Sequence, residues 1–260
     1  MSTDDVLRLA HELADVADRL TLAAFGSDPD VRRKADGSEV TAVDVAVEEA
    51  LRRGIADRFP DHRILGEESG WGDADADPTR PVWTIDPIDG TTNFVKGNPI
   101  FATLIAWSVD GRDLVGVASA PALGSRWDGV VGSGAHQDDR PITVSTTARL
   151  ADAEVSVGGF DDLEARTPGL LATLAGGSTR QRGYGDFWAY CLLAAGSTDA
   201  VVEAQVNPWD VAAVRAIVEA AGGRVTDLDG RDRSDGGSAV ATNGVLHAEL
   251  LTLVAEHRRA

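Results

Sequence analysis

The sequence predicts an α/β protein made of two parts with different patterns. Apolar residues recur at helical spacing in two segments near the N-terminus, and residues 101–144 show only strand patterns. After about Arg149, short strands alternate with helices. The change near residues 146–152 divides the chain into an N-terminal α+β part, residues 1–148, and a C-terminal α/β part, residues 149–260.

Two helices are predicted at the start of the chain. In the first, apolar residues recur every three or four positions: Val6, Leu9, Leu13, Val16 and Leu20. The second helix runs from about Thr41 to Phe59. Between them we expect a loop from Gly26 to Glu39, which contains Pro29 and Gly37.

The rest of the N-terminal part is predicted to be mostly strand. A short strand at 63–66 leads into Glu67, a solvated loop covers 70–81, and a buried strand follows at 82–85. Further strands are expected at 101–109, 114–120, 126–131 and 142–145. Asp110-Gly111 is a tight-turn signal, so these strands form a meander.

The C-terminal part alternates between the two patterns. Strands are expected at 155–157, 200–203, 225–228 and 239–242, and helices at 163–174, 184–195, 211–221 and the C-terminal end. Gly222 and Gly223 end the third of these helices as a C-cap.

The composition excludes several classes of protein. With 42 acidic and 24 basic side chains the net charge is −18, whereas a nucleic-acid binder or a protein that docks on an anionic membrane needs a basic surface. The single cysteine, Cys191, leaves no internal disulfide. Acidic residues stand where a signal peptide is basic, and no apolar run is long enough to span a membrane. We therefore expect a soluble cytoplasmic protein.

The densest chemical signal lies in residues 83–94. A buried strand delivers Asp86 and Asp89 into a turn that Gly90 allows. Oxygen ligands without His or Cys suit a hard cation such as Mg²⁺, and the amides of Gly90 and Thr91 suit an anion. A cation site beside an anion site predicts a site that handles phosphate. An acidic surface turn is the structural alternative, which the apolar strand before it disfavours.

Three more acids are candidates for the same site. Glu67 follows a predicted strand and also fits a solvated loop. Asp44 and Asp210 each stand three residues after a helix-capping residue, Thr41 and Asn207. This spacing fits a structural cap as well as catalysis, and spacing alone does not decide between them.

These segments resemble signatures of the inositol monophosphatase superfamily. The matching motifs are Gly66-Glu67-Glu68, the run 86–94, Trp209–Ala213 with 219–223, and Val40-Thr41 with Asp44 and Glu48. The resemblance implies a layered αβαβα sandwich of the inositol monophosphatase and fructose bisphosphatase type. It also implies Mg²⁺-dependent phosphomonoester hydrolysis, with two to three Mg²⁺ ions per site or Mn²⁺ in their place, and a homodimer.

Site roles follow from the resemblance residue by residue. The implied metal ligands are Glu67, Asp86, Asp89, Asp210, Asp44 and the carbonyl of Ile88. Asp44 and Thr91 are implied to orient or deprotonate the attacking water, with Glu67 as a further catalytic residue. Lys34 matches a lysine in a mobile loop over the site. Five carboxylates at one point would repel one another, so divalent cations must complete such a site.

The substrate is predicted from the C-terminal part. Asp186 stands where inositol monophosphatases carry a small neutral residue, and Glu203 matches the family's acid that contacts the organic part of the ligand. Two carboxylates beyond the phosphate favour a substrate with an ammonium group. The segments around Asp186, Glu203 and Asn207 resemble the actinobacterial-type histidinol-phosphate phosphatases of this superfamily.

The full set of expected substrate-binding residues is Gly90, Thr91, Asp186, Glu203, Asn207 and Asp210. Histidinol phosphate is the first candidate, followed by inositol 1-phosphate and then by sugar bisphosphates or nucleotide 3′-phosphates. Asp186 as a helix cap, with Tyr184, Phe187 and Trp188 in the core, is the structural alternative. A non-catalytic regulatory protein on this scaffold is the alternative from another class.

Overall fold

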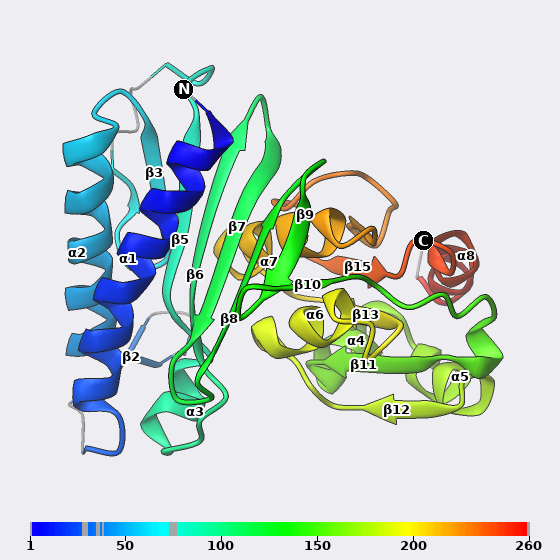
Figure 1. Cartoon of the computed structure of the whole chain (residues 1–260). Coiled ribbons are helices and arrows are strands. Elements are labelled where there is room, and N and C mark those ends of the chain that lie inside the picture. The colour runs from blue at the N-terminus through cyan, green and yellow to red at the C-terminus, as the bar shows by residue number, and fades with distance from the viewer. Residues whose placement is uncertain (1, 28–30, 35–36, 38, 73–76, 259–260) are drawn as a thin grey trace.

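The computed structural model describes residues 2–27, 31–34, 37, 39–72 and 77–258. Its elements form five layers, which Figure 1 shows from α1 and α2 at one side to α8 at the other. Two helices cover one face of a large sheet, two more lie between this sheet and a smaller one, and three cover the far face of the smaller sheet. The predicted αβαβα sandwich is therefore confirmed.

The first helical layer consists of α1 (Thr3–Ala24) and α2 (Ala42–Arg58). Each begins with a capping box, formed by Ser2 with Asp5 in α1 and by Thr41 with Asp44 in α2. Their apolar faces pack with each other and with the large sheet around the buried Trp83. Both helices lie close to the predicted ranges.

The large sheet has eight strands in the order β10-β9-β8-β7-β6-β5-β3-β4. These are β3 (Arg63–Gly66), β4 (Gly70–Trp71), β5 (Val82–Asp89), β6 (Ala102–Val109), β7 (Arg112–Ala120), β8 (Ser125–Val130), β9 (Gly134–Gln137) and β10 (Arg140–Ile142). The strand β5 is parallel to β3 and antiparallel to β6, and it is almost fully buried. Its carboxyl end, which carries the densest motif, therefore lies inside the molecule.

The middle layer consists of α6 (Asp186–Ala194) and α7 (Pro208–Ala220). The helix α7 lies close to the large sheet because two strand residues there are glycines. A Cβ at Gly116 would stand 2.1 Å from the carbonyl oxygen of Ala213, and a Cβ at Gly129 would stand 2.7 Å from the Cα of Ile217. This close approach brings the start of α7 to the end of β5.

The small sheet has the order β12-β11-β13-β15-β14. Its strands are β11 (Glu154–Gly158), β12 (Arg180–Arg182), β13 (Ala200–Glu203), β14 (Arg224–Thr226) and β15 (Ala239–Thr242). The outer layer is made of α4 (Phe160–Arg166), α5 (Leu170–Gly177) and α8 (His247–His257), which share one apolar cluster with this sheet. A short 3₁₀ turn at Leu150–Asp152 precedes β11, between the two sheets in the sequence. The predicted boundary at residue 148 stays a prediction.

Several local predictions were wrong. In the expected loop from Gly26 to Glu39, β1 (Val31–Arg33) pairs with β2 (Glu39–Thr41); residues 28–30, 35–36 and 38 lie outside the described part. The expected helix at 163–174 is two helices separated near Gly169, whose φ is +82°. Strands β4, β9 and β12 had no counterpart among the predictions, and β10 ends at Ile142, where the strand expected at 142–145 begins.

A short helix, α3 (Thr91–Val95), follows β5 and carries residues of the predicted site. In the described ranges, no helix is long and apolar enough to cross a membrane. Cys191 is a buried free thiol in α6, as its apolar surroundings in the sequence predict.

Candidate active site

The end of β5 places two carboxylates inside the molecule. The register with β6 shifts between Asp86 and Asp89, and both residues are 5% exposed or less. One oxygen of Asp86 accepts a hydrogen bond from the amide of Ile88 at 2.9 Å. Gly90 then turns the chain into α3 with a φ of +82°, which glycine adopts without strain.

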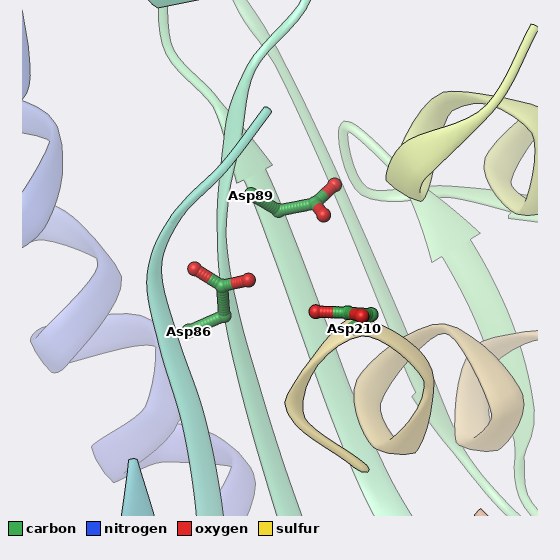
Figure 2. Close-up of side chains that lie close together, drawn as sticks. All are labelled: Asp86, Asp89 and Asp210. Carbon is green, nitrogen blue, oxygen red and sulfur yellow. The ribbon is translucent and has the colours of Figure 1, made fainter. Parts of the chain in front are cut away.

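The third carboxylate of this group comes from the far half of the sequence. Asp210 stands in the first turn of α7, and its Oδ2 accepts a hydrogen bond from the amide of Asn207 at 2.7 Å. Asp86, Asp89 and Asp210 each place an oxygen within 4.8 Å of the others. Figure 2 shows the side chains of Asp86 and Asp89 from β5 lying next to Asp210 at the start of α7. The structure therefore forms a cluster of three acids, named the carboxylate cluster below.

Burial makes the ionised form of these acids costly. It raises the pKa of Asp86 and of Asp89 well above the ordinary range, and the negative charges of neighbouring carboxylates raise both further. Burial also raises the pKa of Asp210 to about 7. A divalent cation bound to such a group of acids would offset their charges and restore the ionised form. All the donors are oxygen atoms, so the cluster fits a hard cation such as Mg²⁺.

Glu67 lies next to the carboxylate cluster, just after β3. Its negative charge is the second cause, after burial, of the raised pKa of Asp86. The ammonium group of Lys34 lies 2.7 Å from Glu67 and 2.8 Å from Glu68. Burial alone would lower the pKa of Lys34, but these bonds outweigh it and raise that pKa above its ordinary value. Lys34 therefore places a positive charge at the edge of the site.

Asp44 reaches the site through a hydroxyl group. Its Oδ2 accepts hydrogen bonds from the amide and the hydroxyl of Thr41, at 2.8 and 2.5 Å. Its Oδ1 lies 3.3 Å from the hydroxyl oxygen of Thr91, which also lies 3.0 Å from the carbonyl oxygen of Ile88. One carboxylate thus caps α2 with one oxygen and accepts a hydrogen bond from Thr91 with the other, so the cap is confirmed, and the catalytic role of Asp44 stays a prediction.

These residues surround a cavity of about 320 Å³ that opens to solvent. Three residues that were not predicted line the cavity: Glu39, Thr92 and Asn93. Most of the predicted site residues line it as well, namely Glu67, Asp86, Ile88, Asp89, Gly90, Thr91, Asp186 and Asp210. The polar side chains of Thr92 and Asn93 directly follow Thr91 in the same motif, and this position was the available signal for them. Asp44 is not among the residues that line the cavity, but it accepts a hydrogen bond from the lining residue Thr91.

Asp186 lies in the cavity wall beside Gly90. Its Oδ2 is 3.6 Å from the position that a Cβ of Gly90 would occupy. Asp186 makes no side-chain cap at the start of α6, where Gly185 is the cap residue, whereas Phe187 is fully buried in the core. The carboxylate is therefore available to a ligand in the cavity.

Glu203 and Asn207 lie outside the set of residues that line this cavity. Glu203, on β13, is 9% exposed and accepts a hydrogen bond from the hydroxyl of Tyr190 at 2.6 Å. Burial raises the pKa of Glu203 to about 8. Asn207 is exposed and contributes its amide to Asp210. Tyr190 was not predicted; its place four residues after Asp186 on the same helix was the available signal.

Comparison with known proteins gives one consistent family. The model of the inositol monophosphatase family matches residues 2–259. A histidinol-phosphatase of Mycobacterium tuberculosis is 45% identical, covering 97% of this chain and 98% of that protein. One from Streptomyces coelicolor is 43% identical, covering 95% and 96%. Among solved structures, an IMPase of Thermotoga maritima has a TM-score of 0.85 and 31% identity, with 97% of both chains covered.

Proposed function

Since this chain belongs to the inositol monophosphatase family and is a phosphomonoesterase, we propose that its substrate is histidinol phosphate, which it hydrolyses to histidinol and phosphate with Mg²⁺. The family and the reaction class set the phosphate chemistry. The substrate is the finer part of the proposal, and it depends on what the cavity offers beyond the phosphate. Such an activity would serve histidine biosynthesis.

One observation carries the choice of substrate. Asp186 lines the same cavity as the carboxylate cluster and lies beside Gly90. A phosphate group held by the cluster's cations and by the amides of Gly90 and Thr91 would direct the organic part of the ester toward Asp186. A carboxylate there attracts an ammonium group, which histidinol phosphate has and inositol phosphates lack. Two relatives that are more than 40% identical bear the name histidinol-phosphatase, which supports the same substrate.

We propose that Mg²⁺ is held by the side chains of Glu67, Asp86, Asp89 and Asp210 and by the carbonyl oxygen of Ile88. Bound Mg²⁺ would supply positive charge that neutralises these acids, polarises the phosphate ester and acidifies the attacking water. The carbonyl of Ile88 already lies within hydrogen-bond distance of Thr91, so the water-orienting group and the cation site are adjacent.

The residues of the chain then act mainly by position. Thr91 would accept a hydrogen bond from the attacking water and pass a proton toward Asp44, whose Oδ1 faces it. Burial raises the pKa of Asp44, while its bonds with Thr41 oppose that rise, so the carboxylate keeps an acceptor site for the proton. Water attacks in line with the departing alkoxide, and no covalent phosphoenzyme is needed.

Further parts of the proposal rest on the family resemblance. We propose a homodimer, which size-exclusion chromatography with light scattering would test, and a cytoplasmic location. Mn²⁺ is the expected substitute for Mg²⁺. Inositol 1-phosphate and sugar bisphosphates remain the alternative substrates. A non-catalytic regulator remains the alternative class, and the presence of Asp44, Thr91 and the whole carboxylate cluster disfavours it.

The substrate is tested by changing Asp186 alone. We expect Asp186→Asn to raise KM for histidinol phosphate by about tenfold or more, because one charge-assisted contact is lost, and to change KM for inositol 1-phosphate little. Asp161→Asn is the matched control, since Asp161 is an exposed acid in the first turn of α4. Equal changes for both esters would contradict the role of Asp186.

A further inference from the structure

Asp186 adopts a backbone conformation that needs support. Its φ is +54°, in the left-handed region that residues other than glycine seldom adopt. It is also the first residue of α6, so its conformation sets where its carboxylate enters the cavity. Whatever holds this turn in place therefore determines the position of the carboxylate.

Two carboxylates from different strands hold this turn. The amide of Phe187 donates a hydrogen bond to Oδ2 of Asp89 at 2.7 Å. The carboxylate of Glu203 on β13 lies against the residue before this turn, since a Cβ at Gly185 would stand 3.2 Å from its Oε1, and the nearby backbone amide of Asp186 lowers the pKa of Glu203 and so opposes the effect of burial. Amides in the first turn of a helix have no partner within the helix, so both carboxylates stabilise the backbone here. The first turn of α6 is thus attached to the carboxylate cluster on one side and to Glu203 on the other.

Glu203 is itself held in place. Its Oε2 accepts the 2.6 Å hydrogen bond from Tyr190, which is 1% exposed and lies one helical turn after Asp186. Space for its other oxygen exists because two neighbours are glycines. A Cβ at Gly158 would stand 2.1 Å from Oε1 of Glu203, and a Cβ at Gly185 would stand 3.2 Å from it. The carboxylate therefore lies against the start of α6 and is hydrogen-bonded to Tyr190 of this helix.

We infer that Glu203, supported by Tyr190, is a positioning residue that fixes the left-handed turn at Asp186 and so sets the preference for phosphate esters bearing an ammonium group. The inference rests on the proposed function, in which Asp186 binds that group. It differs from the role expected from the sequence, where Glu203 contacts the organic part of the substrate directly. Glu203 acts here on the backbone of the residue that makes the contact.

Substitutions at Glu203 separate the two roles. Glu203→Gln keeps a side-chain oxygen beside the amide of Asp186 but removes the charge, whereas Glu203→Ala removes both. The readout is kcat/KM for histidinol phosphate divided by kcat/KM for para-nitrophenyl phosphate, in saturating Mg²⁺. We expect Glu203→Ala to lower this ratio about tenfold and Glu203→Gln to retain most of it. In an Asp186→Ala background, Glu203→Ala should cause no further fall.

Three results would overturn the inference. The first is that the ratio of kcat/KM values is unchanged in Glu203→Ala. The second is that this ratio falls as far in Glu203→Gln as in Glu203→Ala. The third is that adding Glu203→Ala to Asp186→Ala lowers the ratio again by the same factor. The last two would mean that Glu203 attracts the substrate through its own charge.

Hydrogen exchange tests the positioning without any substrate. In Glu203→Ala the amide of Asp186 should exchange about tenfold faster, while the amide of Phe187, bonded to Asp89, serves as the internal reference. Unchanged exchange at Asp186 would refute the inference whatever the substrate is. Faster exchange in an enzyme that shows no preference for histidinol phosphate would refute the proposed substrate and leave the positioning role standing.

Discussion

Replacing Asp210 by asparagine should stabilise the metal-free protein while it weakens the proposed metal site. Burial raises the pKa of Asp210 from its ordinary 3.8 to about 7. Well below pH 3.8 the carboxyl is protonated in both the folded and the unfolded chain. As the pH rises toward 7, the unfolded chain releases this proton and the folded chain retains it, so the free energy of unfolding falls. Asparagine has no proton to release, and its oxygen can still accept from the amide of Asn207.

The magnitude follows from the shift in pKa. A shift of about 3 units corresponds to about 4 kcal/mol, and partial exposure of Asp210 reduces this to about 2–4 kcal/mol. For a chain of this length that is a rise in Tm of roughly 5–10 °C. We therefore expect Asp210→Asn to melt higher than the wild type at pH 8 in EDTA, with most of this difference lost near pH 4.

Thermal unfolding followed by circular dichroism, from pH 4 to pH 8, measures this difference. Added Mg²⁺ should reverse the order at pH 8, because an ion at about 1,000 times its dissociation constant stabilises the wild type by about 4.1 kcal/mol, more than the advantage of the variant. Asp161→Asn is the control and should melt as the wild type does. If Asp210→Asn melts lower than the wild type in EDTA at pH 8, burial of the Asp210 carboxylate does not destabilise the metal-free protein, and the reasoning is refuted.

Three further substitutions test other parts of the site. Asp89→Asn should remove most phosphatase activity at low Mg²⁺, since it deletes a charge of the carboxylate cluster; activity equal to the wild type would exclude Asp89 as a ligand. Thr91→Val should lower kcat by about a hundredfold and Thr91→Ser much less, because only valine lacks the hydroxyl that faces Asp44. A kcat of Thr91→Val equal to that of the wild type would show that Thr91 does not pass the proton. Lys34→Gln should lower the Mg²⁺ concentration at half-maximal activity by about threefold, because it frees Glu67, and an unchanged midpoint would show that the ammonium does not compete with the ion.

The sequence predicted the elements whose signals are local. Helices α1 and α2 show both an apolar period and a capping box, and β5 is an apolar run ending in a turn motif. Strands β1 and β12 escaped prediction because they consist mostly of arginines and carry no alternation of apolar residues. Their strand form comes from pairing with a neighbouring strand, which the local pattern does not show.

The same distinction applies to the site. Asp86 and Asp89 are close in sequence, so their proximity in space was predictable. The approach of Asp210 depends on glycines at the contact between α7 and the large sheet, and spacing along the chain does not show this. For Glu203, residue type and position indicated a role near the substrate, but the direction of its side chain depends on Tyr190 and on room left by Gly158.

The most direct test of the account is the release of inorganic phosphate from a panel of esters by the purified protein. The panel contains histidinol phosphate, inositol 1-phosphate and fructose 1,6-bisphosphate, each measured with Mg²⁺ and with EDTA. We expect turnover only with Mg²⁺ and the highest kcat/KM for histidinol phosphate, because Asp186 lines the cavity and would attract the ammonium group of this ester. A clear preference for inositol 1-phosphate would contradict the proposed substrate. No turnover of any ester would contradict the conclusion that the protein is a phosphomonoesterase.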